Sequence, residues 1–221
     1  MLHRSSTLYC LFMCTLTAIF SPAAMAVEDP ALTTVSQLQT KWETYKFEVP
    51  EGDKQTAFMN SLGEEADAAE TRFPGRVEVL IWDGIITSER ASMANPLSAL
   101  GLAKRARDIL EKAYKKDPAA LSAGATTSLG VLYYRVPGFP IGFGDTEKAR
   151  QLLEQAVQLA PTGLDALYFY GDFLYNQKEY AKALDVFVRA QKLPPHPDRP
   201  LWDHNRHLMI GELIEKIRAK M

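Results

Sequence analysis

The stretch GLDALYFYGDFLYNQKEYAKALDVFVRAQKLPPHP, residues Gly163–Pro197, determines the fold that we predict for this chain. Its apolar residues recur every three or four positions in two runs, which predicts amphipathic helices over residues 165–176 and 180–193. Small residues, Gly171 in the first run and Ala183 in the second, lie where two such helices would cross. A small residue at a crossing lets two backbones approach, so that large neighbouring side chains enter the grooves beside it. The stretch therefore predicts an antiparallel helical hairpin.

The same order of small and large residues occurs twice more upstream. The middle copy has Leu129, Gly130, Tyr133, Ala149, Leu153, Ala156 and Pro161, and the earlier copy has Leu80, Gly84, Thr87, Ala106, Leu110, Ala113 and Pro118. The glycine and the first alanine are 12 positions apart in the last copy, 19 in the middle copy and 22 in the earlier one. We therefore expect insertions between the two helices of both upstream copies. In the earlier copy we expect a longer connection through Asn95, with the next helix beginning near Ser98.

The two ends of the chain also have helical periodicity. Residues 31–47 and 54–73 predict a degenerate first pair, and the helix over 31–47 is expected to bury Leu32, Val35, Leu38, Trp42 and Tyr45. A final helix is predicted near residues 200–220, with Leu201, Leu208, Leu213 and Ile217 facing inward. Stacked repeats need a terminal unit with a polar outer face, and this helix would serve as that cap.

The repeated pattern resembles the tetratricopeptide repeat, whose Trp, Leu-Gly, Tyr, Ala, Phe and Pro positions extend over about 34 residues. The resemblance implies an all-α solenoid of about four antiparallel helix pairs, the first one degenerate, with a C-terminal capping helix. We expect one such domain over residues 27–221. Its clear repeats are about 77–118, 123–161 and 164–197, and its cap is 198–221.

Residues 1–26 have the features of a secretory signal peptide. A weakly basic start precedes an apolar run from Leu8 to Phe20, and Ala24 and Ala26 form the small-residue cleavage pattern. The alternative is a retained membrane anchor, but a run of 13 residues is shorter than the roughly 20 that a spanning helix needs. We expect cleavage after Ala26, a periplasmic or secreted protein and no stable membrane insertion afterwards.

Composition excludes several classes of function. The chain has 2 cysteines, Cys10 and Cys14, and both lie in the leader, so the mature chain has no disulfide, no Cys-ligated zinc site and no cysteine nucleophile. Without Arg4, the mature chain has 24 basic and 27 acidic residues and a formal charge of −3. This mildly acidic balance, with no block of basic residues, argues against a nucleic-acid partner.

Candidate binding residues follow from the resemblance, because in this family the first helix of each pair lines a concave groove. By position, the groove would contain Ile81, Ile85, Ser88, Glu89, Thr127, Val131, Tyr134, Arg135, Tyr168, Asp172, Tyr175 and Asn176. An aromatic, mostly apolar groove with a few polar residues is typical of a ligand site. The alternative is that several of these residues pack against an inserted loop or against the cap.

The insertion Pro137–Gly144 has three large apolar residues, Phe139, Ile141 and Phe143. Exposed apolar patches of this kind are uncommon on soluble proteins. The loop would therefore narrow the groove, meet a partner or pack within its own turn. We include Phe139 and Phe143 in the candidate site because they would narrow the groove.

We find no candidate catalytic residue and no cofactor motif. Asp203, His204 and His207 share a predicted helix, and two histidines three positions apart are able to bind one metal ion. A third ligand on that face is missing, so we predict no metal site. A nucleophile elbow, a HExxH sequence and a phosphate-binding loop are also absent from the sequence. We therefore predict that the protein is not an enzyme.

A second resemblance concerns the leader, the segment YYRVPGFPIGFGD at residues 133–145 and the repeat that follows. Together they are similar to the T-component proteins of periplasmic TRAP transporters, and the similarity is best across Gly130–Leu193. It implies a binder of a small hydrophobic ligand beside a transporter's substrate-binding subunit. The alternative is an adaptor that holds a peptide segment of another protein of the bacterial cell envelope. A closed apolar cavity would favour the first function, and an open groove lined by Arg135, Asp172 and Asn176 the second.

Overall fold

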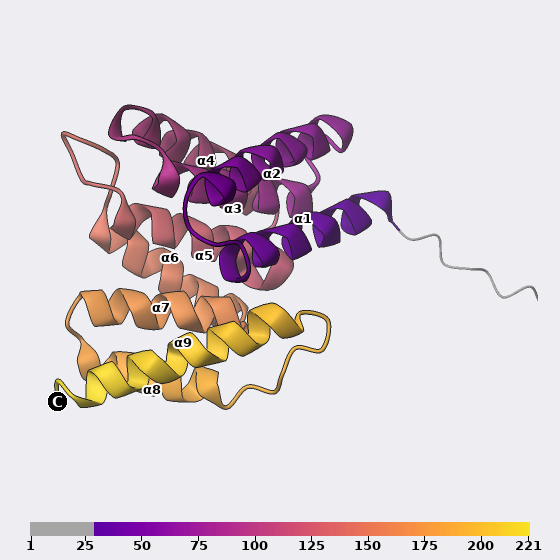
Figure 1. Cartoon of the computed structure of the whole chain (residues 1–221). Helices are drawn as coiled ribbons and strands as arrows, with labels where there is room; N and C mark the ends of the chain where they lie inside the picture. The colour runs from indigo at the N-terminus through magenta and orange to yellow at the C-terminus, as the bar shows by residue number, and fades with distance from the viewer. Residues whose placement is uncertain (1–28) are drawn as a thin grey trace, which may run out of the picture.

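The computed structural model describes residues 29–221, and within that range the chain forms nine α-helices and no strand (Figure 1). The predicted leader and its cleavage site lie outside the described residues. The helices are α1 (Pro30–Phe47), α2 (Asp53–Arg72), α3 (Val77–Met93), α4 (Pro96–Lys116), α5 (Ala120–Arg135), α6 (Thr146–Leu159), α7 (Leu164–Asn176), α8 (Tyr180–Gln191) and α9 (Pro200–Arg218). The predicted all-α repeat fold is confirmed. None of these helices is both long and apolar enough to cross a membrane.

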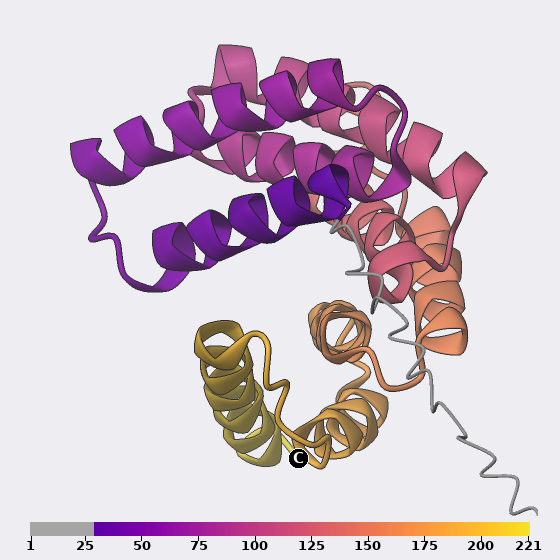
Figure 2. The same cartoon turned by 90° about the vertical axis from the view of Figure 1, so that its right-hand side faces the viewer.

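The helices are arranged in two layers. Helices α1, α3, α5, α7 and α9 each contact the next member of that series and form the inner layer, while α2, α4, α6 and α8 pack outside them. Helix α9 therefore occupies the place of the first helix of a further pair. The array curves until α9 faces α1 (Figure 2), and these two helices, the first and last of the described chain, are in contact.

Each predicted crossing brings a glycine against a large side chain of the paired helix. A Cβ atom added to Gly84 would lie 2.5 Å from Leu110 Cγ, and one added to Gly130 would lie 2.6 Å from Leu153 Cγ. A Cβ atom on Gly171 would lie 2.7 Å from the ring of Phe187, which is fully buried. These distances are too short for real Cβ contacts, so the pairs α3–α4, α5–α6 and α7–α8 depend on glycine at these positions.

The insertion in the earlier copy differs from the prediction. We expected a longer connection before Ser98, but only Ala94 and Asn95 separate α3 from α4. The added residues lengthen the two helices, to 17 and 21 residues against 13 and 12 in α7 and α8. Asn95 caps α4, because its side-chain oxygen accepts from the backbone N–H groups of Leu97 and Ser98 at 3.1 and 3.2 Å. Pro96 then occupies the first turn, where no N–H is needed.

The inward face of α9 was predicted correctly at Ile217, which is buried, and at Leu213, which packs against the core, but not at Leu208. Leu208, expected inside, is 54% exposed, and the buried face includes Trp202, Arg206, Ile210 and Ile214 instead. The sequence pattern assigned only aliphatic residues to this face, whereas the helix also buries an indole and a guanidinium. In α1, Leu32 is likewise exposed and Ala31 takes its place in the core.

We expect Gly171→Ala to lower the free energy of unfolding by about 1–3 kcal/mol, because the added methyl group overlaps the rigid ring of Phe187. Urea denaturation followed by circular dichroism measures the change.

Gly211→Ala is the matched control, since Gly211 is also helical and has nothing within 4 Å of an added Cβ. That variant is expected to gain about 0.5–1 kcal/mol from helix propensity. A Gly171→Ala variant as stable as the Gly211→Ala variant would contradict the role of the crossing.

Candidate functional site

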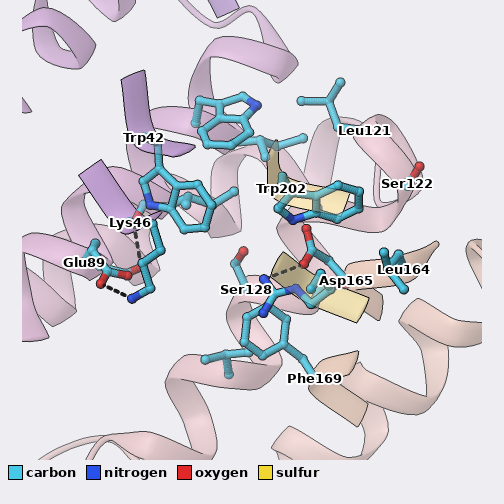
Figure 3. Close-up of a pocket in the computed structure, with 18 of the residues that line it drawn as sticks. Trp42, Lys46, Glu89, Leu121, Ser122, Ser128, Leu164, Asp165, Phe169 and Trp202 are labelled. Carbon is cyan, nitrogen blue, oxygen red and sulfur yellow. Dashed lines mark hydrogen bonds and ion pairs between the residues drawn. The ribbon is translucent and has the colours of Figure 1, made fainter. Parts of the chain in front are cut away.

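A cavity of about 1180 Å³ lies inside the curve of the inner layer, and we call it the central cavity. It is lined from all five inner helices, from one face of α4 and from the segment Leu193–Arg199 that precedes α9 (Figure 3). The predicted groove residues that line it are Ile81, Ile85, Ser88, Glu89, Thr127, Val131 and Arg135. Helices α3 and α5 therefore bring together the part of the candidate site that their sequences predicted.

All three tryptophans of the chain line the central cavity, Trp42 from α1, Trp82 from α3 and Trp202 from α9. The rings of Trp42 and Trp82 meet edge to face, with centroids 5.9 Å apart. The guanidinium of Arg199 lies 4.1 Å from the ring centroid of Trp202 and 5.9 Å from that of Trp82. One wall of the cavity is thus a continuous set of indoles and a guanidinium, with flat apolar faces.

An ion pair joins the two ends of the array beside this wall. Arg199 Nε donates to Glu43 Oε1 at 2.6 Å, although the two residues are 156 positions apart in the sequence. Both side chains are largely buried, so the pair is only weakly screened by water. The contact between Arg199 and Glu43 therefore fixes the start of α9 against α1 and completes the circumference of the cavity.

A second ion pair, between a buried arginine and a partly exposed aspartate, lies where α9 meets α7. Arg206 Nη2 is 2.7 Å from Asp165 Oδ1, and its guanidinium stacks 4.0 Å from the ring centroid of Tyr168. Figure 3 shows Asp165 and Phe169, which lie on successive turns of α7. Arg206 therefore covers Tyr168, and Phe169 is the aromatic residue of α7 that lines the cavity.

Asp172, Tyr175 and Asn176 of α7 do not line the central cavity, and Asn176 is exposed. The hydroxyl of Tyr134 donates to Asp172, which also accepts from Arg135 Nη2 at 3.1 Å. Asn176 Nδ2 donates to the backbone oxygen of Asp172 at 2.7 Å. Tyr175 packs on Tyr180, and Lys220 Nζ lies 4.7 Å from its ring centroid. Only Tyr175 meets the C-terminal cap, as the alternative interpretation expected, whereas Tyr134 and Asp172 contact each other between α5 and α7.

Burial keeps Tyr134 protonated. Desolvation is the largest influence and raises the pKa of Tyr134, and the Asp172 carboxylate raises it further, against the opposing charge of Arg135. The hydroxyl therefore remains a hydrogen-bond donor to Asp172 throughout the range in which proteins are folded. The residues Tyr134, Arg135 and Asp172 form a structural link between α5 and α7.

The three large apolar residues of the inserted loop lie in different surroundings. Phe143 packs edge to face on Tyr133 at 5.6 Å and under the guanidinium of Arg107 at 4.6 Å. Pro137 and Ile141 reach the edge of the central cavity, although Ile141 is 71% exposed. Phe139 is 93% exposed and lines no part of the cavity. Only one side of the loop therefore narrows the cavity.

Sequence reasoning missed the contribution of α9 and of the segment before it. The cavity lining includes Arg199, Trp202 and Arg206, yet none of them was a candidate site residue. The available signal was Arg-Pro-Leu-Trp at residues 199–202, an arginine and a large aromatic residue at the start of a capping helix. Leu121 and Ser122 were also missed, because three successive residues of left-handed φ, at 48°, 55° and 62°, bring the start of α5 to the cavity.

The acidic and histidine side chains of α9 have structural contacts. Asp203 Oδ1 accepts from the backbone N–H of His196 at 3.0 Å, and His207 Nδ1 is 3.4 Å from Asp203 Oδ2. His204 is exposed. Among residues 29–221, no group of three His, Cys, Asp or Glu side chains is placed to hold a metal ion. Asp203 instead anchors the proline-rich segment to the helix that follows it.

We expect Glu43→Gln to lower the free energy of unfolding by about 1–3 kcal/mol, because it leaves the buried Arg199 guanidinium without its carboxylate. Amide hydrogen exchange is expected to rise in the first turns of α9 as that end of the array loosens.

The matched control is Glu65→Gln, which removes a carboxylate from the exposed pair with Lys41. Its effect is expected to stay within about 1 kcal/mol. Equal effects of the two substitutions, with no change of hydrogen exchange in α9, would show that the Arg199–Glu43 pair does not hold the array closed.

Comparisons with known proteins show which sequences and structures this chain is similar to. Residues 141–202 match the sequence model of the tetratricopeptide repeat. The solved structure of TTC0263, a thermophilic TPR protein of Thermus thermophilus, superposes with a TM-score of 0.57 at 16% identity, over 84% of this chain and 93% of that one. MamA of MSR-1 gives a TM-score of 0.43 at 16% identity, over 85% of this chain and 96% of that one. Yeast Tom70 gives 0.37 at 12% identity, over 86% of this chain and 47% of that one.

Proposed function

Starting from the premise that the chain is a tetratricopeptide repeat protein, we propose that it is a non-enzymatic binding protein that encloses a small, mostly apolar molecule in the central cavity. Proteins of this class bind other proteins or peptides and serve as scaffolds. The proposal of a small ligand goes further, and the observation that carries it is the closed circumference. Arg199 of the α9 end meets Glu43 of α1, so the inner helices form a ring of contacts around the cavity.

The lining supports this proposal. A pocket that binds small ligands is concave and mainly apolar, with a few polar groups that fix orientation. The central cavity has indole faces from three helices, aliphatic side chains such as Ile85 and Val131, and two buried arginines. Its volume of about 1180 Å³ suits a ligand of several rings or a long chain. Asp172, which would have lined an open peptide groove, belongs instead to the contacts between α5 and α7, and Asn176 bonds to Asp172 within α7.

The place of action that we propose is the periplasm or the exterior of the cell. The support is in the sequence, namely the apolar run from Leu8 to Phe20 and the pattern before Ala26. The similarity of residues 130–193 to the T-components of TRAP transporters supports a role beside an envelope transporter, with the ligand passed to or from its substrate-binding subunit. This assignment rests on likeness of fold and loop.

The central cavity is tested with the uncharged dye N-phenyl-1-naphthylamine, whose fluorescence rises in apolar surroundings. We expect saturable binding to the wild-type protein. Val131→Trp adds an indole inside the cavity and is expected to weaken binding by at least about tenfold, because it occupies the volume that the dye needs.

Leu208→Trp introduces the same side chain on the exposed face of α9. It controls for the added indole and is expected to leave the dissociation constant unchanged. Dye binding that Val131→Trp does not alter would place the dye elsewhere and contradict the proposal.

An adaptor function is the second candidate, and the inserted loop favours it. Phe139 is 93% exposed and Ile141 is 71% exposed on one short loop, which is unusual for apolar side chains that meet no partner. A partner protein bound to this loop would bury Phe139 and would not occupy the central cavity.

Native mass spectrometry of the protein purified from its own cells distinguishes the two functions. A bound small molecule that Val131→Trp removes supports the carrier. A stoichiometric polypeptide that Phe139→Ser removes, with the cavity variant unaffected, supports the adaptor.

A further inference from the structure

The central cavity contains buried polar atoms that have no hydrogen-bond partner within the protein. They are Nε1 of Trp42, Nε1 of Trp202, Oγ1 of Thr127, Nη2 of Arg199, Nε of Arg206 and Oδ1 of Asp165, the last an acceptor 2.7 Å from Arg206 Nη2. All six residues line the cavity, and Trp42, Trp202, Thr127 and Arg206 are each less than a tenth exposed. An indole N–H and a guanidinium N–H only donate hydrogen bonds. The cavity therefore has a surplus of donors that come from α1, α5, α9 and the residue before α9.

The charges of the cavity, by contrast, are balanced. Every lysine and arginine that lines it has a carboxylate partner already. The pairs are Lys46 with Glu89 at 2.7 Å, Arg135 with Asp172 at 3.1 Å, Arg199 with Glu43 at 2.6 Å and Arg206 with Asp165 at 2.7 Å. A bound carboxylate would approach these acids as well as the cations. The attraction of the cations would therefore offset only part of the free-energy cost of taking its charge out of water. Because the charges of the lining are already paired, the cavity favours a ligand whose acceptor atoms carry no net charge.

The shape of the lining restricts the ligand further. Trp42, Trp82 and Trp202 present ring faces and edges, and Arg199 stacks on Trp202 at 4.1 Å. Phe169 adds a fourth aromatic ring from α7. Flat ring systems pack on such surfaces with little loss of conformational entropy. Two of the unpartnered donors, Nε1 of Trp42 and of Trp202, lie on the edges of these same rings. Both nitrogens are covered by neighbouring protein atoms, so an oxygen at the rim of a flat ligand would reach them only after the indoles shift.

We propose that the ligand is an uncharged, flat, ring-bearing molecule whose polar groups are acceptor oxygens, such as the carbonyl oxygens of a ketone, ester or quinone. This inference rests on the proposed function, that the central cavity is the binding site. It adds the chemical class of the ligand. The ring system packs on the indoles, and the oxygens accept from Trp42, Trp202 and Arg199. A ligand rich in donors leaves these N–H groups unpaired and is rejected.

Four naphthalenes that differ in one substituent test the proposal by isothermal titration calorimetry. They are 2-acetylnaphthalene with an uncharged acceptor, 2-naphthoate with a carboxylate, 2-ethylnaphthalene with no polar atom and naphthalen-2-ylmethylammonium with a charged donor. We expect the acetyl compound to bind at least about tenfold more tightly than each of the other three.

The variant Trp42→Phe with Trp202→Phe keeps two aromatic rings and removes two donors. Affinity for 2-acetylnaphthalene is expected to fall by about tenfold or more, and affinity for 2-ethylnaphthalene to stay within about twofold. Tyr114→Phe is the control, because it removes a hydroxyl that bonds to Gln155 outside the cavity lining. Circular dichroism verifies folding, and the comparison of the four compounds on the wild-type protein needs no variant.

The outcomes separate the two proposals. If none of the four compounds and no dye binds, the proposed function and this inference both fall. If the compounds bind and compete with the dye, but 2-naphthoate or 2-ethylnaphthalene binds as tightly as 2-acetylnaphthalene, only the inference falls. Equal loss of affinity for the acetyl and ethyl compounds in the double variant also overturns it, because ring packing would then explain the whole effect.

Discussion

The contact between a glycine and the large side chain facing it is the constraint on which the structure depends. At Gly84, Gly130 and Gly171 the backbone of the inner helix lies against Leu110, Leu153 or Phe187 of the outer helix, with no room for a methyl group. This close approach sets how each pair packs. Because the three pairs repeat one contact, they stack with a regular offset, and the offset accumulates into the curve that brings α9 to α1 (Figure 2).

Curvature alone leaves a groove, and the Arg199–Glu43 pair makes it a cavity. An isolated buried ion pair is weak evidence for stability, since desolvation of both charges opposes their attraction. Its value here is geometric, because it specifies where the last helix meets the first. The arginine also stacks on Trp82 and Trp202, so one side chain links closure of the array to the surface that a ligand would contact.

The balance of charge against hydrogen-bonding capacity distinguishes this cavity from an ordinary apolar core. A core pairs its polar atoms internally. The central cavity pairs its charges but leaves indole and guanidinium N–H groups, including those of Trp202 and Arg206, without acceptors. Unpaired donors of this kind destabilise the protein alone. They favour a ligand with acceptor atoms, because such a ligand forms hydrogen bonds with them that a purely apolar ligand cannot form.

The sequence by itself determined the hairpins, because glycine, alanine and large apolar residues at fixed spacing are a local property of the chain. It also determined the inner faces of α3 and α5, where Ile81, Ile85 and Val131 lie as expected. Only the tertiary structure decided that Trp202 and Arg206 of α9 face inward and that Arg199 meets Glu43. Those contacts join the two ends of the described chain, and they depend on curvature accumulated over every repeat, which no short stretch of sequence records.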